Sequence, residues 1–315
     1  MIKDTYGRQV NNLRLSVTQR CNLRCFYCHS EGEDYHSHVE MTTEEIRRIV
    51  NVAVSLGLNK VKLTGGEPLL RPDFVGIVST LSQIPCLQEV SMTTNGISLV
   101  SLAKPLKAAG LSRVNISLGT LNSDTYQIMT GVNAINQVLA GIKAAREADL
   151  FPIKINMVIL KGVNDDEVPA MIDFTKDNGL ILQLIEFEAV NSNTENFVKY
   201  HSDLDKIETV LSEKAHRTII RKMNKRRKFL LKDGGEIEVV KPMHNTAFCK
   251  YCSRLRVTSD GKFKPCLFRS DNLVDFLTPM RSGARDEELV SLLLDAVNRR
   301  KPYFMEGNEK ATLES

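Results

Sequence analysis

Six short apolar segments, each followed by a helical pattern, run in series through the first 190 of the chain's 315 residues. Serial strand-and-helix units predict an α/β fold, in which a parallel sheet is connected by right-handed crossovers. The clearest helix pattern runs from Thr42 to Leu56, with Thr42 and Glu45 at capping-box spacing and Gly57 just past its end. The predicted strands run from Leu13 to Thr18, Lys60 to Gly65, Glu89 to Asn95, Arg113 to Gly119, Ile153 to Leu160 and Leu180 to Glu188.

Six such units fit either an open doubly wound sheet or an incomplete barrel. The first strand and the loop after it, RLSVTQRCNLRC, contain no glycine, so the fingerprint of a dinucleotide-binding sheet is absent. We therefore predict an incomplete (βα)6 barrel of the TIM type over residues 1–190. In both architectures the chemistry is expected at the carboxyl ends of the strands.

The pattern changes after residue 190, and residues 191–315 are predicted to form a smaller α+β extension. One helix is expected from Asp203 to Ala215 and another from Asp286 to Arg300. Between them, the segments RTIIRKM, KFLLK and EIEVV are typical of antiparallel strands joined by tight turns.

Composition narrows the functional classes. Hydrophobic residues make up 42% of the chain and charged residues 25%, which excludes a disordered or collagen-like protein. No window approaches the ~18 apolar residues that a membrane-spanning helix needs, and the polar start MIKDTYGRQVNN does not resemble a secretory signal. We expect a cytoplasmic protein. The net charge of +4 is too small for a nucleic-acid coat, but it would suit a small anionic ligand if it were concentrated in one cleft.

Cysteine spacing is the strongest chemical signal. The chain has seven cysteines, and in a protein of this kind clustered cysteines are typical of metal ligands or catalytic groups rather than disulfides. Cys21, Cys25 and Cys28 form C-x3-C-x2-C directly after the first predicted strand. Three thiolates on one loop can bind a metal cluster and leave one metal vertex open to another ligand.

A second group, Cys249, Cys252 and Cys266, forms C-x2-C-x13-C near the other end of the chain. On its own this spacing fits either a second cluster with an open vertex or a zinc site with His244 as fourth ligand. Cys86 has no cysteine nearby and is interpreted as a structural thiol that is buried or half-buried.

Two further details identify a resemblance. Tyr27 precedes the third cysteine, and Gly65-Gly66-Glu67-Pro68 follows the second predicted strand; with the first cysteine motif, this pattern resembles the radical S-adenosylmethionine (SAM) superfamily. Most of the chain, to about Leu267, is similar to the GTP 3',8-cyclase family of molybdenum cofactor biosynthesis. The segments that carry this similarity include GRQVNNLRLSVTQRCNLRCFYC, KLTGGEPLLRPD and FCKYCSRLRVTSDGKFKPCLF.

The resemblance implies two 4Fe-4S clusters and SAM as cofactors of a lyase. The N-terminal cysteines Cys21, Cys25 and Cys28 would hold the cluster that chelates SAM, and Cys249, Cys252 and Cys266 would hold a second cluster that binds guanine. A 5'-deoxyadenosyl radical would abstract the ribose 3' hydrogen of GTP, and the resulting carbon radical would attack guanine C8. The implied product is (8S)-3',8-cyclo-7,8-dihydroguanosine 5'-triphosphate, formed in the first step of molybdopterin biosynthesis.

The same resemblance assigns further site residues. Arg254 and Arg256 are implied to be catalytic together with the first three cysteines. The SAM contacts implied by the family are Tyr27, Gly66 and Ser117. The implied GTP contacts are Arg14, Lys62, Thr93, Lys154, Arg254, Leu255 and Arg256.

Three of these cations are also informative without the family. Arg14, Lys62 and Lys154 each stand between two apolar residues in a predicted strand. Such alternation often indicates a solvated face. In a central strand covered on both sides, it indicates instead a charge that is directed into a cavity. We favour the cavity.

The implied partners are GTP, an electron donor and a functional link to the downstream cyclic pyranopterin monophosphate synthase, with neither membrane nor nucleic acid. The sequence leaves monomer and homodimer open. The chain departs from the family pattern at Gln183, Glu188 and Gly119, where bacterial relatives have Arg, Met and Asp. It also lacks the family's C-terminal double glycine and ends in EKATLES.

Two rival functions remain open. A peptide- or protein-modifying radical SAM enzyme with an auxiliary cluster would usually carry more cysteines and a peptide-binding module, for which the chain before Cys21 is too short. A zinc-stabilised nucleic-acid-binding protein would use the basic run Lys222 to Lys228, which sequence alone more simply predicts to be a solvated hairpin turn.

Overall fold

A computed structural model of the chain describes residues 2–33, 35, 37–190 and 194–305. All six strands predicted in the first part of the chain are present, and each pairs with the next in parallel. The α/β fold with a parallel sheet is therefore confirmed. These strands are β1 (Asn12–Ser16), β2 (Lys60–Thr64), β3 (Glu89–Thr94), β4 (Arg113–Ser117), β5 (Lys154–Ile159) and β6 (Ile181–Glu186).

Two strands from the C-terminal part extend the parallel set on both sides. β10 (Arg254–Val257) pairs in parallel with β1, and β9 (Glu236–Val240) pairs in parallel with β6. The antiparallel pairings predicted for the C-terminal segments are also present, since β7 (Ala215–Ile220) pairs with β8 (Arg227–Leu231) and β8 with β9. At the other edge, β11 (Lys262–Lys264) joins β10 to β12 (Val274–Asp275).

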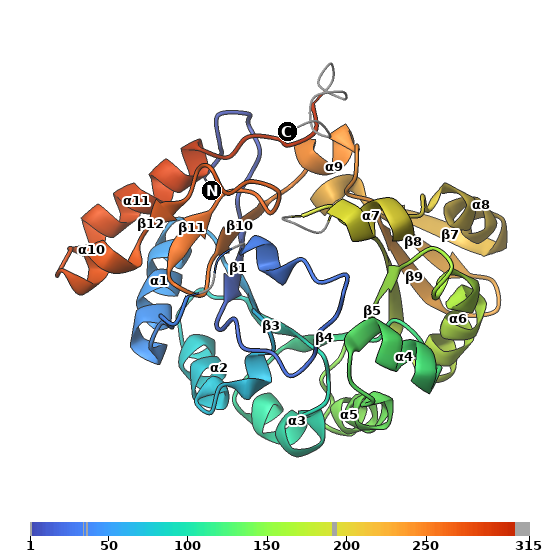
Figure 1. The fold of residues 1–315 in the computed structure, drawn as a ribbon. Coiled ribbons are helices and arrows are strands. Elements are labelled where there is room, and N and C mark those ends of the chain that lie inside the picture. The colour runs from blue at the N-terminus through green and yellow to red at the C-terminus, as the bar shows by residue number, and fades with distance from the viewer. Residues whose placement is uncertain (1, 34, 36, 191–193, 306–315) are drawn as a thin grey trace.

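The resulting sheet has twelve strands in the order β12-β11-β10-β1-β2-β3-β4-β5-β6-β9-β8-β7. Figure 1 shows these strands as an open arc with helices along its outer side. The interpretation of this arc as an incomplete barrel of the TIM type stays a prediction. The domain boundary at residue 190 stays one too, although the sheet continues across it through β9 and β10.

The helices along the outer face of the arc pack on the sheet through an apolar side, as α1 does with Ile46, Ile49, Val50 and Ala53. In α1 the predicted capping box is present, since Thr42 Oγ1 accepts from the Glu45 amide and Glu45 Oε2 accepts from the Thr42 amide. The helices that follow β1 to β5 are α1 (Thr43–Ser55), α2 (Phe74–Ser82), α3 (Leu99–Ala108), α4 (Ser123–Thr130), α5 (Ile135–Glu147) and α6 (Val168–Asp177). The later helices are α7 (Thr194–Tyr200), α8 (Asp205–Lys214), α9 (Thr246–Lys250), α10 (Leu277–Arg281) and α11 (Asp286–Asn298).

The hydrophobic core lies between the sheet and these helices. On β1, Leu13 and Leu15 are buried in this core, whereas Arg14 between them lies on the opposite, inner face of the arc. Val61 and Leu63 flank Lys62 on β2 in the same way. Alternate residues of these strands therefore face the helices on one side and the inside of the arc on the other, because successive side chains of a strand point to opposite faces. None of the helices within the described ranges is long and apolar enough to cross a membrane.

Candidate functional site

The inner face of the arc encloses a cavity of about 1330 Å³, which we call the central cavity. Its lining includes residues of β1 to β6, β9 and β10 and the loops at their carboxyl ends. Among the residues that the structure describes, fourteen lysines and arginines line it against six glutamates, a formal excess of eight positive charges. The whole chain carries only +4, so its positive charge is concentrated in this one place.

Most of the predicted site residues meet at this cavity. Arg256 does not itself line it, but its guanidinium pairs with Glu31, which does. Leu255 is fully buried in the hydrophobic core, so its side chain lies away from the cavity. Cys249 and Cys266 interact electrostatically with Cys252 but lie outside the lining. Cys86 also lies outside it and is exposed, so the prediction that it is buried or half-buried was wrong. The predicted residues that line the cavity are Arg14, Cys21, Cys25, Tyr27, Cys28, Lys62, Gly66, Thr93, Ser117, Lys154, Cys252 and Arg254.

The loop that carries the first three cysteines is held by the loop after β2. The amide of Gly66 donates to Thr18 O at 2.7 Å, and the amide of Glu67 donates to Arg20 O at 2.7 Å. A Cβ atom at Gly66 would lie 2.3 Å from Arg20 O, so only glycine permits this approach. The two glycines of the motif therefore fix the position of the cysteine loop.

Glu67 completes this junction. Its buried carboxylate accepts hydrogen bonds from Thr94 Oγ1 and from the Asn95 amide, each at 2.7 Å, and so ties the end of β2 to the end of β3. Sequence reasoning quoted Glu67 only as part of a motif and gave it no role. The sequence feature that could have indicated this role is an acidic residue directly after two glycines at the end of a predicted strand.

The first three thiols are free and close enough to influence one another's ionisation. Burial raises the pKa of Cys25 to about 12, and the neighbouring Cys28 and Cys21 add to this rise. Tyr27 also interacts with the Cys25 thiol. Thiols that resist ionisation together are stabilised as thiolates by a positively charged metal group, so this donor set fits an iron–sulfur cluster.

The second group of thiols lies at the end of α9 and beyond β11. Burial by itself would raise the pKa of Cys252, but Arg254 and Arg300 lower it to about 7. Cys249 and Cys266 both interact electrostatically with Cys252, so the three thiols form one donor set, which also fits an iron–sulfur cluster.

The zinc alternative needs His244 as a fourth ligand. The ring of His244 instead packs on Phe304, with ring centroids 5.0 Å apart. Over the described ranges, no group of three or more His, Cys, Asp or Glu side chains, the two cysteine groups included, is already arranged to hold a metal ion.

A row of cations crosses the cavity on neighbouring strands. Arg14 is in register with Arg256 on one side and with Lys62 on the other. The Lys62 ammonium donates to Asn115 Oδ1 at 2.8 Å. Burial lowers the pKa of Lys62 well below its ordinary value, and the nearby Arg113, Arg14 and Lys154 lower it further. The charged form of Lys62 is therefore destabilised by burial and by the neighbouring cations, and a bound anion would lower this free-energy cost.

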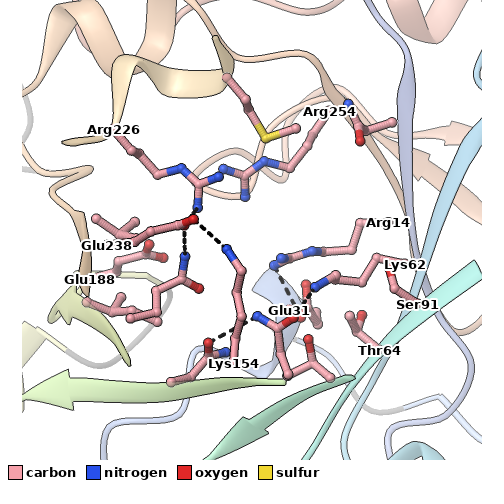
Figure 2. Close-up of a pocket in the computed structure, with 18 of the residues that line it drawn as sticks. Arg14, Glu31, Lys62, Thr64, Ser91, Lys154, Glu188, Arg226, Glu238 and Arg254 are labelled. Atoms are coloured by element: carbon pink, nitrogen blue, oxygen red, sulfur yellow. Dashed lines mark hydrogen bonds and ion pairs between the residues drawn. The ribbon is translucent and has the colours of Figure 1, made fainter. Parts of the chain in front are cut away.

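Glu31 supplies part of this missing negative charge. It lies in η1 (Ser30–Gly32), three residues after Cys28, and its carboxylate is 2.5 Å from Arg256 and 3.7 Å from Arg14. Burial alone would raise the pKa of Glu31, but the two guanidinium groups lower it to about 2. Figure 2 shows Glu31 between the labelled cations. Sequence reasoning missed this residue.

Glu238 on β9 has the same role on the other side of the cavity. Its Oε1 accepts from the Lys154 ammonium at 2.6 Å, and its Oε2 accepts from Gln183 Nε2 at 3.0 Å. Burial lowers the pKa of Lys154 to about 8 despite the opposing effect of Glu238. Glu238 was missed as well, although its place between Ile237 and Val239 follows the alternation that identified Lys154.

The basic run Lys222 to Lys228 includes the hairpin turn between β7 and β8 that the sequence predicted, and Lys222, Lys225 and Arg227 are exposed as expected. It forms η4 (Met223–Lys225) and the start of β8, where it faces the central cavity. The sequence did not reveal that one side of this turn also lines the cavity, because that depends on the pairing of β8 with β9. The residues of this run that line the cavity are Lys222, Met223, Lys225, Arg226 and Lys228.

Several polar atoms of this interior are buried without a hydrogen-bond partner among the described residues. They include the Nε atoms of Arg14, Arg226 and Arg254 and Oε2 of Glu188. Buried polar groups are normally paired, so three unpaired guanidinium donors in one cavity indicate a site for an anionic ligand.

Comparisons with known proteins agree over nearly the whole chain. Residues 15–175 match the family described as the Radical SAM superfamily, and residues 180–306 match the family described as Molybdenum Cofactor Synthesis C. A protein of Thermococcus kodakarensis named "Probable GTP 3',8-cyclase" is 49% identical over 309 residues, which cover 96% of this chain and 100% of that protein. A protein of Methanosarcina acetivorans with the same name is 48% identical, with coverages of 100% and 93%.

Solved structures share the fold at much lower identity. Streptococcus suis SuiB bound to the precursor peptide SuiA aligns with a TM-score of 0.66 at 15% identity, over 96% of this chain and 67% of that chain. SuiB bound to S-adenosylmethionine aligns with a TM-score of 0.63 at 17% identity, over 82% and 60%. These likenesses show the fold alone.

Proposed function

The chain belongs to the radical SAM superfamily and, within it, to the GTP 3',8-cyclase family, and on this basis we propose that it converts GTP to (8S)-3',8-cyclo-7,8-dihydroguanosine 5'-triphosphate. This is the first step of molybdopterin biosynthesis. The observation that carries the proposal is full-length identity of 49% to a probable cyclase. The cavity supports it, because its excess of eight positive charges suits the triphosphate.

Cys21, Cys25 and Cys28 would hold the cluster that binds SAM, with Tyr27, Gly66 and Ser117 around the cofactor. When bound, this cluster and SAM supply the 5'-deoxyadenosyl radical that abstracts the ribose 3' hydrogen. The chain would position the substrate. Cys252 lines the same cavity, so a second cluster held by Cys249, Cys252 and Cys266 would face the substrate space. The protein's contribution is mainly proximity and the exclusion of water from the radical.

The cations of the cavity would bind the triphosphate. Arg14, Lys62 and Lys154 lie on the inner faces of three parallel strands. Arg254 lies at the start of β10, with one Nη atom bound to Asn224 Oδ1 at 2.6 Å and its Nε atom unpaired. Guanidinium groups fit phosphate oxygens in pairs, so the proposed substrate would satisfy the donors that the protein leaves open. Thr93, Leu255 and Arg256 would complete the contacts, with Leu255 acting through its backbone because its side chain lies in the core.

An external electron donor and a downstream cyclic pyranopterin monophosphate synthase are part of the same proposal. A peptide-modifying function is the second candidate, since SuiB bound to a precursor peptide shares the fold. The fold alone does not favour it, because the relatives that share full-length sequence similarity are probable cyclases.

The test is anaerobic incubation of the reconstituted protein with dithionite, SAM and GTP. We expect formation of 5'-deoxyadenosine together with loss of GTP and appearance of the cyclised triphosphate. Cys25→Ser should abolish SAM cleavage, whereas Cys86→Ser, at an exposed cysteine far from both motifs in sequence, should leave it unchanged. SAM cleavage that continues in Cys25→Ser, or intact GTP after turnover by the wild type, would contradict the proposal.

A further inference from the structure

Arg226 lies in the central cavity but has no place in the functions assigned so far. It precedes β8, and its side chain is 14% exposed. Its neighbour Arg227 faces outward, with a side chain that is 54% exposed and 3.8 Å from Glu208. The two arginines therefore differ in environment although they are adjacent in sequence.

The nearest anion to Arg226 is already shared. Arg226 Nη1 is 3.6 Å from Glu238 Oε2, an ion-pair distance that is too long for a hydrogen bond. The same carboxylate accepts hydrogen bonds from Lys154 and Gln183, and it lies 3.7 Å from Arg221. One negative charge thus faces three positive charges, which leaves Arg226 only partly compensated.

The other groups near Arg226 are also cations. Burial lowers the pKa of Arg226, and the charges of Arg221 and Arg14 lower it further, against the opposing effect of Glu238. Arg226 and Arg254 also interact electrostatically, and in Figure 2 their guanidinium groups point toward one another. Both have a buried Nε atom without a partner. A buried cluster of incompletely compensated guanidinium groups costs free energy unless a ligand brings negative charge between the side chains.

Resting on the proposed function, we propose that Arg226 is a further triphosphate-binding residue of the substrate site. Arg226 lies between Lys154 and Arg254, which are both proposed GTP contacts. A polyphosphate offers several anionic oxygens over the distance that separates such cations, whereas ribose and guanine offer none at neutral pH. The β7–β8 connection would then add a second source of phosphate ligands to those of the parallel strands.

The experiment compares Arg226→Gln with Arg227→Gln at the adjacent exposed position. Calorimetric titration of the reconstituted protein without reductant measures the affinity for GTP and for GMP. We expect Arg226→Gln to weaken GTP binding by about tenfold or more, as for the loss of a charge-assisted bidentate contact. GMP binding should change by less than about twofold, and Arg227→Gln should match the wild type for both nucleotides. In turnover assays, Arg226→Gln should raise the KM for GTP and leave kcat nearly unchanged.

Three outcomes would overturn the inference: unchanged GTP affinity in Arg226→Gln, equal losses for GTP and GMP, or equal losses in both variants. Iron content, melting temperature and SAM cleavage without GTP show whether the variant is intact. If Arg226→Gln does not fold, Arg226→Lys takes its place, because it keeps the charge but loses the paired donors. A GTP affinity equal to that of the wild type in Arg226→Lys would then overturn the inference. Failure of the wild type to consume GTP would contradict the proposed function instead, whatever the variants show.

Discussion

The ammonium group of Lys154 lies among the carboxylate of Glu238 and the guanidinium groups of Arg221 and Arg226. Burial and these arginines lower the pKa of Lys154 to about 8, so its charge is lost as the pH rises through that value. A bound triphosphate would favour the charged form, so GTP binding should take up a proton in this range. We expect the affinity for GTP to fall progressively between about pH 7.5 and 9.5, by at most about tenfold per pH unit for one proton.

Lys154→Arg tests this origin, because arginine stays charged over the whole range. Calorimetric titrations of GTP at several pH values should show a shallower decline in Lys154→Arg than in the wild type. Part of the slope should remain, because the pKa of the buried Lys62 is also lowered. Identical pH profiles for the two proteins would mean that Lys154 does not control the decline.

At the scale of elements, η1 places a carboxylate where the substrate's phosphates are expected. Glu31 has a positive φ of 52° and pairs with Arg14 and Arg256, which are both proposed GTP contacts. In the ligand-free protein it compensates these cations, and its low pKa means that this stabilisation is present above about pH 4.5 and is lost as the pH falls toward 2. Bound GTP would supply the same compensation.

We therefore expect Glu31→Gln to lower the free energy of unfolding of the ligand-free protein by about 3 kcal/mol, because two buried cations lose their partner. The same variant should bind GTP more tightly, and its melting temperature should rise more on adding GTP than that of the wild type. Thermal scans with and without GTP measure both effects. A smaller GTP-induced shift in Glu31→Gln would show that Glu31 supports the bound substrate rather than occupying its place.

The elements also show what the sequence could and could not predict. The parallel strands and the inward direction of Arg14, Lys62 and Lys154 follow from local alternation, since a strand's period of two needs no knowledge of distant segments. The pairing of β10 with β1 joins residues about 240 positions apart, and no local pattern in the four residues of β10 indicates it. For the same reason the cavity position of Arg226, which depends on β8 joining β9, was not predicted.

For the whole molecule, the charge distribution matters more than the total charge. The residues outside the cavity lining carry a net negative charge, because the lining has an excess of eight positive charges and the whole chain an excess of only four. The arc around this cavity uses both ends of the chain, since β1 precedes the first cysteine group, β10 lies between Cys252 and Cys266 of the second, and α11 follows both groups. The two proposed cluster sites are therefore linked through the termini.

A buried ion network makes this link. Asp4 Oδ2 accepts from Arg8 Nε and from Arg300 Nη1, each at 2.7 Å, and the Asp4 and Arg300 side chains are almost fully buried. The two arginines in turn donate to the backbone of the second cysteine group: Arg8 Nη1 to Cys249 O at 3.1 Å and Arg300 Nη2 to Cys252 O at 2.8 Å. One carboxylate near the N-terminus thus orients the two groups that hold the second cysteine loop.

Asp4→Asn should leave two buried guanidinium groups without a counter-ion and lower the free energy of unfolding by about 3 kcal/mol or more. Because Arg8 and Arg300 both donate to the backbone of the second cysteine loop, iron should fall from about eight to about four per chain while SAM cleavage without GTP continues. Asp286→Asn is the control, because Asp286 also pairs with a residue far away in sequence, Arg48, but is 70% exposed, so its loss should cost less than about 1 kcal/mol. Denaturant unfolding and the iron-to-protein ratio measure both effects. Equal loss of SAM cleavage and of GTP turnover in Asp4→Asn would mean that the network supports the whole fold and not the second site in particular.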